Sequence, residues 1–423
     1  MKRLFIMTLA LVALAVWTLP AAAEITLDGQ YRVRAETRVN ADWMDDEPTG
    51  TSTGDNTSVT GQRVRLTAKA NAGEDVTVKI TLQDTRQWGA GQENTNTGGI
   101  DPNNNLDLHE SWVKLDNLFG APVAIKVGRQ AINIADQRLI GGFEWSNNAR
   151  SFDAAILSYK NDVVGVRAIR ANIKEGPDSI NDDFNLNILE AVITAVEDHT
   201  FTLYAINAVD NGVFASEFDL MNYGLHAKGK VGPADYSVEY NMQTGDESDV
   251  VEIEASAFAI TAGFSLPDVA GLRIGVQYVD ASGDDGSDAT TQETFDNLLP
   301  TNHLHYGYAD RQAWMNMNGI NLNVSAKPMD KLFVKLDYWM FGVNEVEDDL
   351  YYASGNTGVA GNAAYDDDAG TEIDLTVKYA YSDAVKFQLG ASLYQAGGFI
   401  EDSLAPVDSA DQTWSYLQMA VNF

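Results

Sequence analysis

The connections between the strand-like segments of this 423-residue chain alternate strictly between short and long. Gly, Pro, Asn and Asp residues mark short turns, which we find at 71–74, 117–120, 160–162, 196–199, 231–233, 266–271, 327–330 and 381–383. Longer polar stretches lie between them, at about 40–60, 89–105, 131–151, 175–183, 208–216, 246–250, 283–314, 345–369 and 399–411. Eight short and nine long connections join eighteen strands, and both ends of the mature chain then lie on the side of the short turns.

This sorting of connections by length predicts the fold class. An outer-membrane barrel has an even number of antiparallel strands, short periplasmic turns and longer extracellular loops. A soluble β-sandwich or propeller has no comparable reason to place its short and long connections at opposite ends. We therefore predict an all-β fold, a transmembrane antiparallel up-and-down β-barrel of eighteen strands that spans 24–423.

Apolar and polar residues alternate within the segments, as in strands whose two faces meet different surroundings. In 332–340 the apolar residues alternate with Lys335 and Asp337. Because a charge in hydrocarbon costs several kcal/mol, the apolar series must face lipid and the charged series the lumen. The closing segment 412–423 alternates in the same way and ends on Phe423. Such an ending resembles the C-terminal signal that the assembly machinery of bacterial outer-membrane barrels reads.

The N-terminus and the overall charge predict the compartment. In 1–23, Lys2 and Arg3 precede an apolar run that ends in Ala-Ala-Ala, which is typical of a cleaved secretory signal peptide. The chain has no cysteine, so it offers neither a disulfide scaffold nor a C-x-x-C-H haem site, and we expect no cofactor. The formal charge of −33 becomes −35 once Lys2 and Arg3 are removed, which argues against binding nucleic acid. We expect the outer membrane of a Gram-negative bacterium, with outer-membrane lipid and lipopolysaccharide as neighbours.

The alternation also predicts a basic stripe on the lumen side of the early strands. Its members are Arg32, Arg34, Arg38, Arg63, Arg65, Lys69, Lys79 and Lys126. Acidic partners on neighbouring strands could neutralise these cations, because unpaired buried charge is expensive. Alternatively, the stripe attracts anionic groups of a solute, because the guanidinium group of Arg can form two parallel hydrogen bonds with a carboxylate. Glu36 is the one inward acid that we identify on the first two strands, and it cannot neutralise all the inward arginines there. We therefore predict a constriction that attracts anions. Its preference for anions should weaken when Arg63 and Arg65 are replaced by alanine.

Longer blocks of the sequence carry a family resemblance. They contain Gly128, Arg129, Gln130, Asp136, Gln137, Arg138, Trp145, Asn147, Arg150, Phe152, Asp153, Pro300, Asn302, His303 and Tyr306. In this order the blocks resemble the alginate-export family of outer-membrane proteins, and the resemblance covers most of the mature chain. It implies an eighteen-stranded barrel with an arginine-rich lumen through which a polyuronate leaves the periplasm. Arg129, Arg138 and Arg150 match family motifs and are implied as lumen-lining residues.

Two function classes remain open. The first is a porin-like channel for a hydrophilic, anionic solute or polysaccharide, with periplasmic or envelope proteins as further partners. The second is a barrel sheath in a larger envelope complex such as a porin–cytochrome conduit. We expect no enzyme, because the G-x-S-x-G match at 50–54 lies in a polar loop without the helix that this motif requires. No metal site is expected, with Ca²⁺ at Asp284, Asp285 and Asp288 as a weaker alternative whose spacing does not match an EF-hand.

Overall fold

The computed structural model describes residues 24–44, 56–89, 106–175, 183–211 and 217–423. The predicted signal peptide 1–23, the motif at 50–54 and parts of the predicted loops 40–60, 89–105, 175–183 and 208–216 lie outside the described residues. No helix in the described part is long and apolar enough to cross a membrane.

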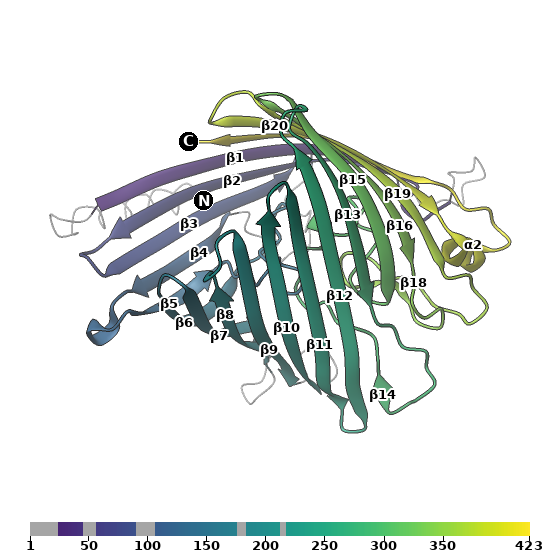
Figure 1. Cartoon of the computed structure of the whole chain (residues 1–423), viewed down its shortest axis with the longest axis horizontal. Helices are drawn as coiled ribbons and strands as arrows, with labels where there is room; N and C mark the ends of the chain where they lie inside the picture. Colours follow the sequence, from purple (N-terminus) through teal and green to yellow (C-terminus); the bar gives the residue numbers. More distant parts are fainter. Residues whose placement is uncertain (1–23, 45–55, 90–105, 176–182, 212–216) are drawn as a thin grey trace.

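The described chain closes into one antiparallel β-barrel (Figure 1). The barrel strands are β1 (Glu24–Val39), β2 (Thr57–Asn71), β3 (Val76–Gln87), β4 (Leu106–Leu115), β5 (Val123–Gln130), β6 (Phe152–Lys160), β7 (Val164–Lys174), β8 (Phe184–Ile193), β9 (His199–Asn211), β10 (Glu217–Val231), β11 (Ala234–Ser248), β12 (Val251–Leu266), β13 (Leu272–Ala281), β15 (Met317–Met329), β16 (Leu332–Gly342), β19 (Asp368–Ala380), β20 (Val385–Ala396) and β21 (Gln412–Asn422). The sheet counts 19 strands, of which β14 (Thr291–Gln292) belongs to a loop. The predicted eighteen-stranded barrel is therefore confirmed.

Short elements lie in the connections between the barrel strands. They are η1 (Leu118–Gly120), η2 (Asn302–Leu304), β17 (Leu350–Tyr351), β18 (Thr357–Val359) and α2 (Gly398–Leu404). None of them was predicted, because the helical ones have three to seven residues and the strands two or three, too short to show a period in the sequence.

The barrel closes where its first and last strands pair. β1 runs antiparallel to β21, from Gln30 opposite Asn422 to Val39 opposite Thr413. The terminal Phe423 exchanges two backbone hydrogen bonds with Gly29, at 2.9 and 2.6 Å. A Cβ at position 29 would lie 2.3 Å from the Phe423 ring, so glycine makes room for the closing aromatic residue. Glu24 lies opposite Asn71, and the Asn422 N–H donates to the Ala384 carbonyl, so both ends of the barrel lie with the short turns, as the alternation predicts.

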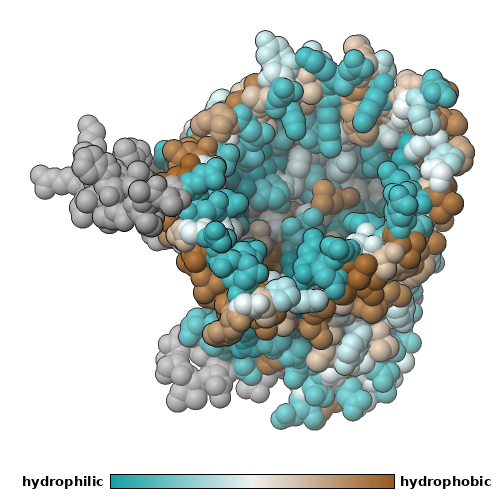
Figure 2. All heavy atoms as spheres, turned by 60° about the vertical axis from the view of Figure 1, so that its left-hand side comes forward, coloured by the Kyte–Doolittle hydropathy of each residue, from teal (hydrophilic) through white to brown (hydrophobic). Residues whose placement is uncertain are grey.

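The two faces of the wall differ as the alternation requires. On β16, Leu336 is 44% exposed on the outer face whereas its neighbour Asp337 is 4% exposed on the inner face. Figure 2 turns the end that carries the C-terminus forward and shows a hollow lined mainly by hydrophilic residues, with hydrophobic residues gathered on the outer wall.

One predicted long loop is wrong. We expected a polar connection at 246–250, but β11 continues to Ser248 and β12 begins at Val251, so only two residues separate them. The ladder continues through the charged residues, with a register shift between Asp246 and Ser248. Above the membrane both faces of a hairpin meet water, so charged side chains there do not end a strand.

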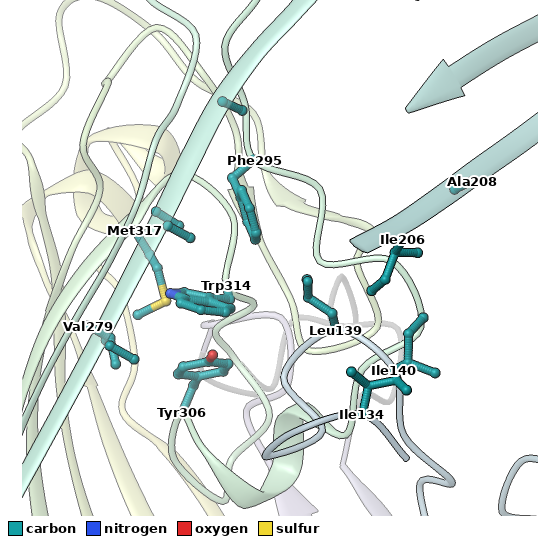
Figure 3. Packing of buried hydrophobic residues seen from close by; sticks show 14 of the residues in the cluster. Ile134, Leu139, Ile140, Ile206, Ala208, Val279, Phe295, Tyr306, Trp314 and Met317 are labelled. Atoms are coloured by element: carbon teal, nitrogen blue, oxygen red, sulfur yellow. The ribbon is translucent and has the colours of Figure 1, made fainter. Parts of the chain in front are cut away.

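Two long connections fold into the lumen, which the sequence analysis did not predict. The first inward loop (131–151) and the second inward loop (282–316) meet at Leu139 and Leu299, where the Leu299 N–H donates to the Leu139 carbonyl at 2.9 Å. Their apolar side chains pack together and against the wall, as Figure 3 shows. The packed set includes Ile134, Leu139 and Ile140 from the first loop, Phe295, Tyr306 and Trp314 from the second, and Ile206, Ala208 and Val279 from the wall.

Candidate functional site

The arginines of the predicted stripe hold the first inward loop against the wall. Arg32 donates from its two terminal nitrogens to the carbonyls of Glu144 and Ser146, each at 2.8 Å. Arg34 donates to the Trp145 carbonyl at 2.8 Å and lies 3.9 Å over the Trp145 ring. Arg32 and Arg34 are buried. Backbone carbonyls of the chain itself therefore take up donors that the sequence analysis assigned to a solute.

The Glu144 carboxylate completes this anchor, which we call the arginine anchor (Arg32, Arg34, Arg63, Arg65 and Glu144). Arg63 and Arg65 contact this carboxylate at 3.0 and 2.9 Å. Burial alone would raise the pKa of Glu144, but the hydrogen bond from His109 and the charges of Arg65 and Arg63 outweigh it and hold the pKa well below its usual range. The first alternative for the stripe, neutralisation by acidic partners, therefore applies to Arg63 and Arg65, but their acid comes from a loop and not from a neighbouring strand.

We predict that acid weakens this anchor. A carboxyl whose folded pKa lies below its unfolded value of about 4.3 stabilises the docked loop above that pH, and the contribution is lost as the pH falls below it. Channel conductance in a planar bilayer should therefore begin to change below about pH 5 in the native protein and go on changing as the pH falls towards the lower folded pKa, and it should stay flat in Glu144→Gln. A pH dependence that survives in Glu144→Gln would assign it to another group.

Arg38 anchors the second inward loop. It donates to the Ala309 carbonyl at 2.6 Å and to the Gln412 side chain at 2.9 Å. On the opposite wall, backbone N–H groups of the same loop donate to carboxylates: Ala309 to Glu372 at 2.7 Å and Tyr308 to Asp374 at 3.3 Å. The basic wall thus binds carbonyls and the acidic wall binds N–H groups. Glu372 was missed by the sequence analysis, although its alternation with Ile373 could have placed it inside.

The family-motif residues join the two inward loops to each other. Gln137 accepts from Thr301 at 3.2 Å, and Arg150 donates to the Leu299 and Pro300 carbonyls at 2.5 and 3.1 Å. Burial lowers the pKa of Arg150 to about 10, so it remains a cation at neutral pH. Two further contacts have the same effect, Arg138 with Tyr306 and His303 stacked on Trp145. Asn147 instead binds the Gln62 carbonyl of β2, and Asn302 binds the Ala353 carbonyl in the connection between β16 and β19. The resemblance therefore marks residues that hold the inward loops in place.

The remaining motif residues lie beside this junction. Asp136 is 3.5 Å from Lys228 and 3.9 Å from His226 on the wall. The Gln130 side chain donates to the carbonyls of Gly128 and Ala154, both at 3.0 Å, and Phe152 is buried.

Arg129 does not line the lumen, contrary to the prediction. On β5 it shares its face with Val127, which is 49% exposed on the outer wall. Its guanidinium forms two hydrogen bonds with Asp153 on β6, at 2.9 and 2.8 Å. The family resemblance implied that Arg129 lines the lumen. The alternation along β5, however, places Lys126 on the inner face and Arg129 on the outer face.

The predicted Lys69, Lys79 and Lys126 form a separate group near the short-turn end, together with Lys114, which was not predicted. Lys69 on β2 lies directly opposite Lys79 on β3, and Lys114 on β4 lies opposite Lys126 on β5. Lys79 pairs with Glu110, and Lys114 pairs with Asp116 at 2.6 Å. Among the described residues no carboxylate lies within 4.0 Å of Lys69 or Lys126. We call these four residues the lysine group.

The predicted calcium trio is not brought together. The acidic residues that lie close are Asp284, Asp285 and Glu293. Asp288 instead accepts from the N–H and the hydroxyl of Thr290, at 2.9 and 2.7 Å. Nothing beyond clustering of exposed acids points to a cation there.

Comparisons with known proteins agree with this architecture. A family model described as Alginate export matches residues 24–410. The crystal structure of Pseudomonas aeruginosa OccK11 (OpdR) is 11% identical with a TM-score of 0.62, and the match covers 94% of this chain and 96% of that chain. Pseudomonas aeruginosa OpdO is 12% identical with a TM-score of 0.63, covering 95% and 97%. Acinetobacter baumannii OccAB1 is 11% identical with a TM-score of 0.62, covering 94% and 96%. At these identities the solved structures show the fold alone, and a search of curated proteins finds no match.

Proposed function

Because this chain belongs to the alginate-export family and forms an outer-membrane β-barrel channel, we propose that it passes a hydrophilic, anionic solute or polysaccharide passively. The arginine anchor is engaged by the inward loop, so it is not the main support for an anion. The support comes from the lysine group, whose members lie within a few residues of the short turns that end β2 and β4 and begin β3 and β5. This is the periplasmic end of an outer-membrane barrel.

The carrying observation is that two pairs of lysines face each other directly across neighbouring strands. Like charges directly opposite are destabilising in a sheet. Two carboxylates serve four ammonium groups, and Lys126 lies 4.6 Å over the Trp112 ring instead. Because this arrangement of like charges costs stability, it is consistent with a functional role for the four lysines. An anion that enters from the periplasm would relieve their repulsion.

The alternative, a sheath around an electron-carrying protein, is less well supported. A sheath needs a wide lumen, but 131–151 and 282–316 pack inside the barrel and join each other. A narrowed aqueous passage suits a selective channel better than a sleeve.

Reversal potentials test the proposal. Lys69→Glu with Lys126→Glu should shift the reversal potential across a salt gradient towards cation selectivity in a planar bilayer. The shift should be larger near 0.1 M salt than at 1 M, because the screening length falls from about 10 Å to about 3 Å. Lys331→Glu is the control, because it reverses one charge in a turn outside the lumen and should leave the reversal potential unchanged. If the double variant leaves the potential where the native channel has it, the lysine group does not govern permeation.

A further inference from the structure

A groove crosses the outer wall of the barrel over β5 to β10. Its volume is about 460 Å³. Most of its lining is apolar and includes Ala155, Leu157, Ala168, Leu189, Ala205 and Met221. Ala168 lies in register between Leu157 and Leu189, and Leu189 lies opposite Ala205. Small side chains therefore form the floor of the groove between projecting leucines.

Polar side chains form the edge of this groove nearest the extracellular loops. Arg170 on β7 donates to Asn187 on β8 at 2.8 Å, and Asn187 donates to Asn207 on β9 at 3.1 Å. Asn207 in turn donates to Asp219 on β10 at 2.5 Å. These residues share the outer face with Leu189, because the residues that alternate with them, such as Ile188 and Ile206, are buried on the inner side.

The height of Arg170 places it beside the outer leaflet. It lies seven residues beyond Val163 in the short turn before β7. At about 3.4 Å per residue and a strand tilt of about 40°, this corresponds to roughly 18 Å, within an apolar band about 25 Å tall. On β16 the outer face remains apolar up to Met340, nine residues beyond its short turn. A cation at the height of Arg170 would meet hydrocarbon unless something polar reaches it.

Arg170 differs from two other arginines on the outer face, because no acidic side chain pairs with it among the described residues. Arg86 pairs with Asp84 at 2.7 Å and Arg129 pairs with Asp153 at 2.8 Å, both on the outer face. Arg170 has no carboxylate within 4.0 Å among the described residues, and its guanidinium donates to the neutral side-chain amide of Asn187. An unneutralised cation above an apolar groove is complementary to an anionic amphiphile.

We propose that this groove binds a phosphorylated glycolipid of the outer leaflet, the lipid A part of lipopolysaccharide. An acyl chain would lie over the alanine floor, and a phosphate would accept from the free N–H groups of the Arg170 guanidinium, whose planar fork matches phosphate oxygens. The Asn187 and Asn207 amides are placed to contact the sugar. Basic residues at membrane level are a known means of retaining anionic lipid headgroups.

The experiment measures lipid retained by the detergent-purified barrel. Native mass spectrometry counts bound bis-phosphorylated lipid A and bound dephosphorylated lipid A. The native protein should prefer the phosphorylated form, and Arg170→Gln should reduce that preference about tenfold, because hydrogen bonds to charged groups contribute at least this much. Arg86→Gln, which removes a paired outward arginine, should leave the preference unchanged. Ala168→Leu, which fills the groove, should reduce retention of both lipids.

Two results would overturn the proposal. The first is that the native protein shows no preference for phosphorylated lipid A, or that Arg170→Gln and Arg86→Gln reduce this preference equally. The other is a second copy of the chain on the same groove. The native chain has no cysteine, so disulfide-linked dimers of Leu189→Cys in isolated outer membranes would report that arrangement directly. Monomeric Leu189→Cys together with the Arg170-dependent preference supports the lipid site.

Discussion

Replacing Arg63 and Arg65 together by alanine is expected to release the first inward loop from the wall and to raise single-channel conductance. Arg63 donates to the Glu144 and Ser146 carbonyls at 3.3 Å, and Arg65 forms two hydrogen bonds with the Glu144 carboxylate, at 3.0 and 2.9 Å. The Glu144 side chain is 55% exposed, so the loss is smaller than the roughly 3–5 kcal/mol of a fully buried pair. If the lost hydrogen bonds to charged groups cost about 2–3 kcal/mol, docking of the loop weakens about 30- to 150-fold.

Recordings in a planar bilayer distinguish this anchoring role from a role in selectivity. We expect larger and noisier conductance steps in the double variant. Lys69→Ala with Lys126→Ala is the matched control, because it removes two inward cations that hold no loop. If the arginine variant keeps the native conductance and only its reversal potential moves, the arginines serve the permeating anion and the anchor is not their main role.

The wall of this barrel could be predicted from the sequence because its rules are local. Period-two alternation decides which face a side chain takes, and Gly, Pro, Asn and Asp mark where a strand turns. Leu336 and Asp337 lie on opposite faces for that reason. The same rules failed at 246–250, where charged residues continue the hairpin of β11 and β12 in water.

The interior could not be predicted because its partners are distant in the chain. Arg63 meets Glu144, 81 residues away, and Arg138 meets Tyr306, 168 residues away. Parity placed Arg63 inside but does not say whether a solute or a loop occupies the space in front of it. One signal was present in the sequence: Ile132, Ile134 and Ile140 are apolar residues in a long polar loop. Such residues would be exposed if the loop projected into water, so they favour a loop that folds inward.

Replacing Arg138 by methionine is expected to destabilise the folded barrel strongly. The Arg138 side chain is 5% exposed and its Nε lies 3.6 Å from the Glu239 carboxylate, which is 2% exposed. Without Arg138, Glu239 keeps its hydrogen bond from the Tyr204 hydroxyl, at 2.6 Å, but has no cation within 4.0 Å among the described residues. Removing one partner of a buried pair costs about 3–5 kcal/mol. Urea unfolding in detergent, followed by tryptophan fluorescence, should show a lower midpoint for Arg138→Met.

A second substitution identifies the cause of that loss. Glu239→Gln in the Arg138→Met background should recover most of the stability, because replacing both members of a buried pair is often nearly neutral, whereas an orphaned charge is not. Arg129→Met is the matched control, since its partner Asp153 is exposed and an exposed pair contributes only about 0–1 kcal/mol. If Glu239→Gln restores nothing, the loss comes instead from the Tyr306 hydrogen bond and the Trp314 ring that Arg138 also contacts. Arg138 would then stabilise the junction of the inward loops through packing, and its charge would be incidental.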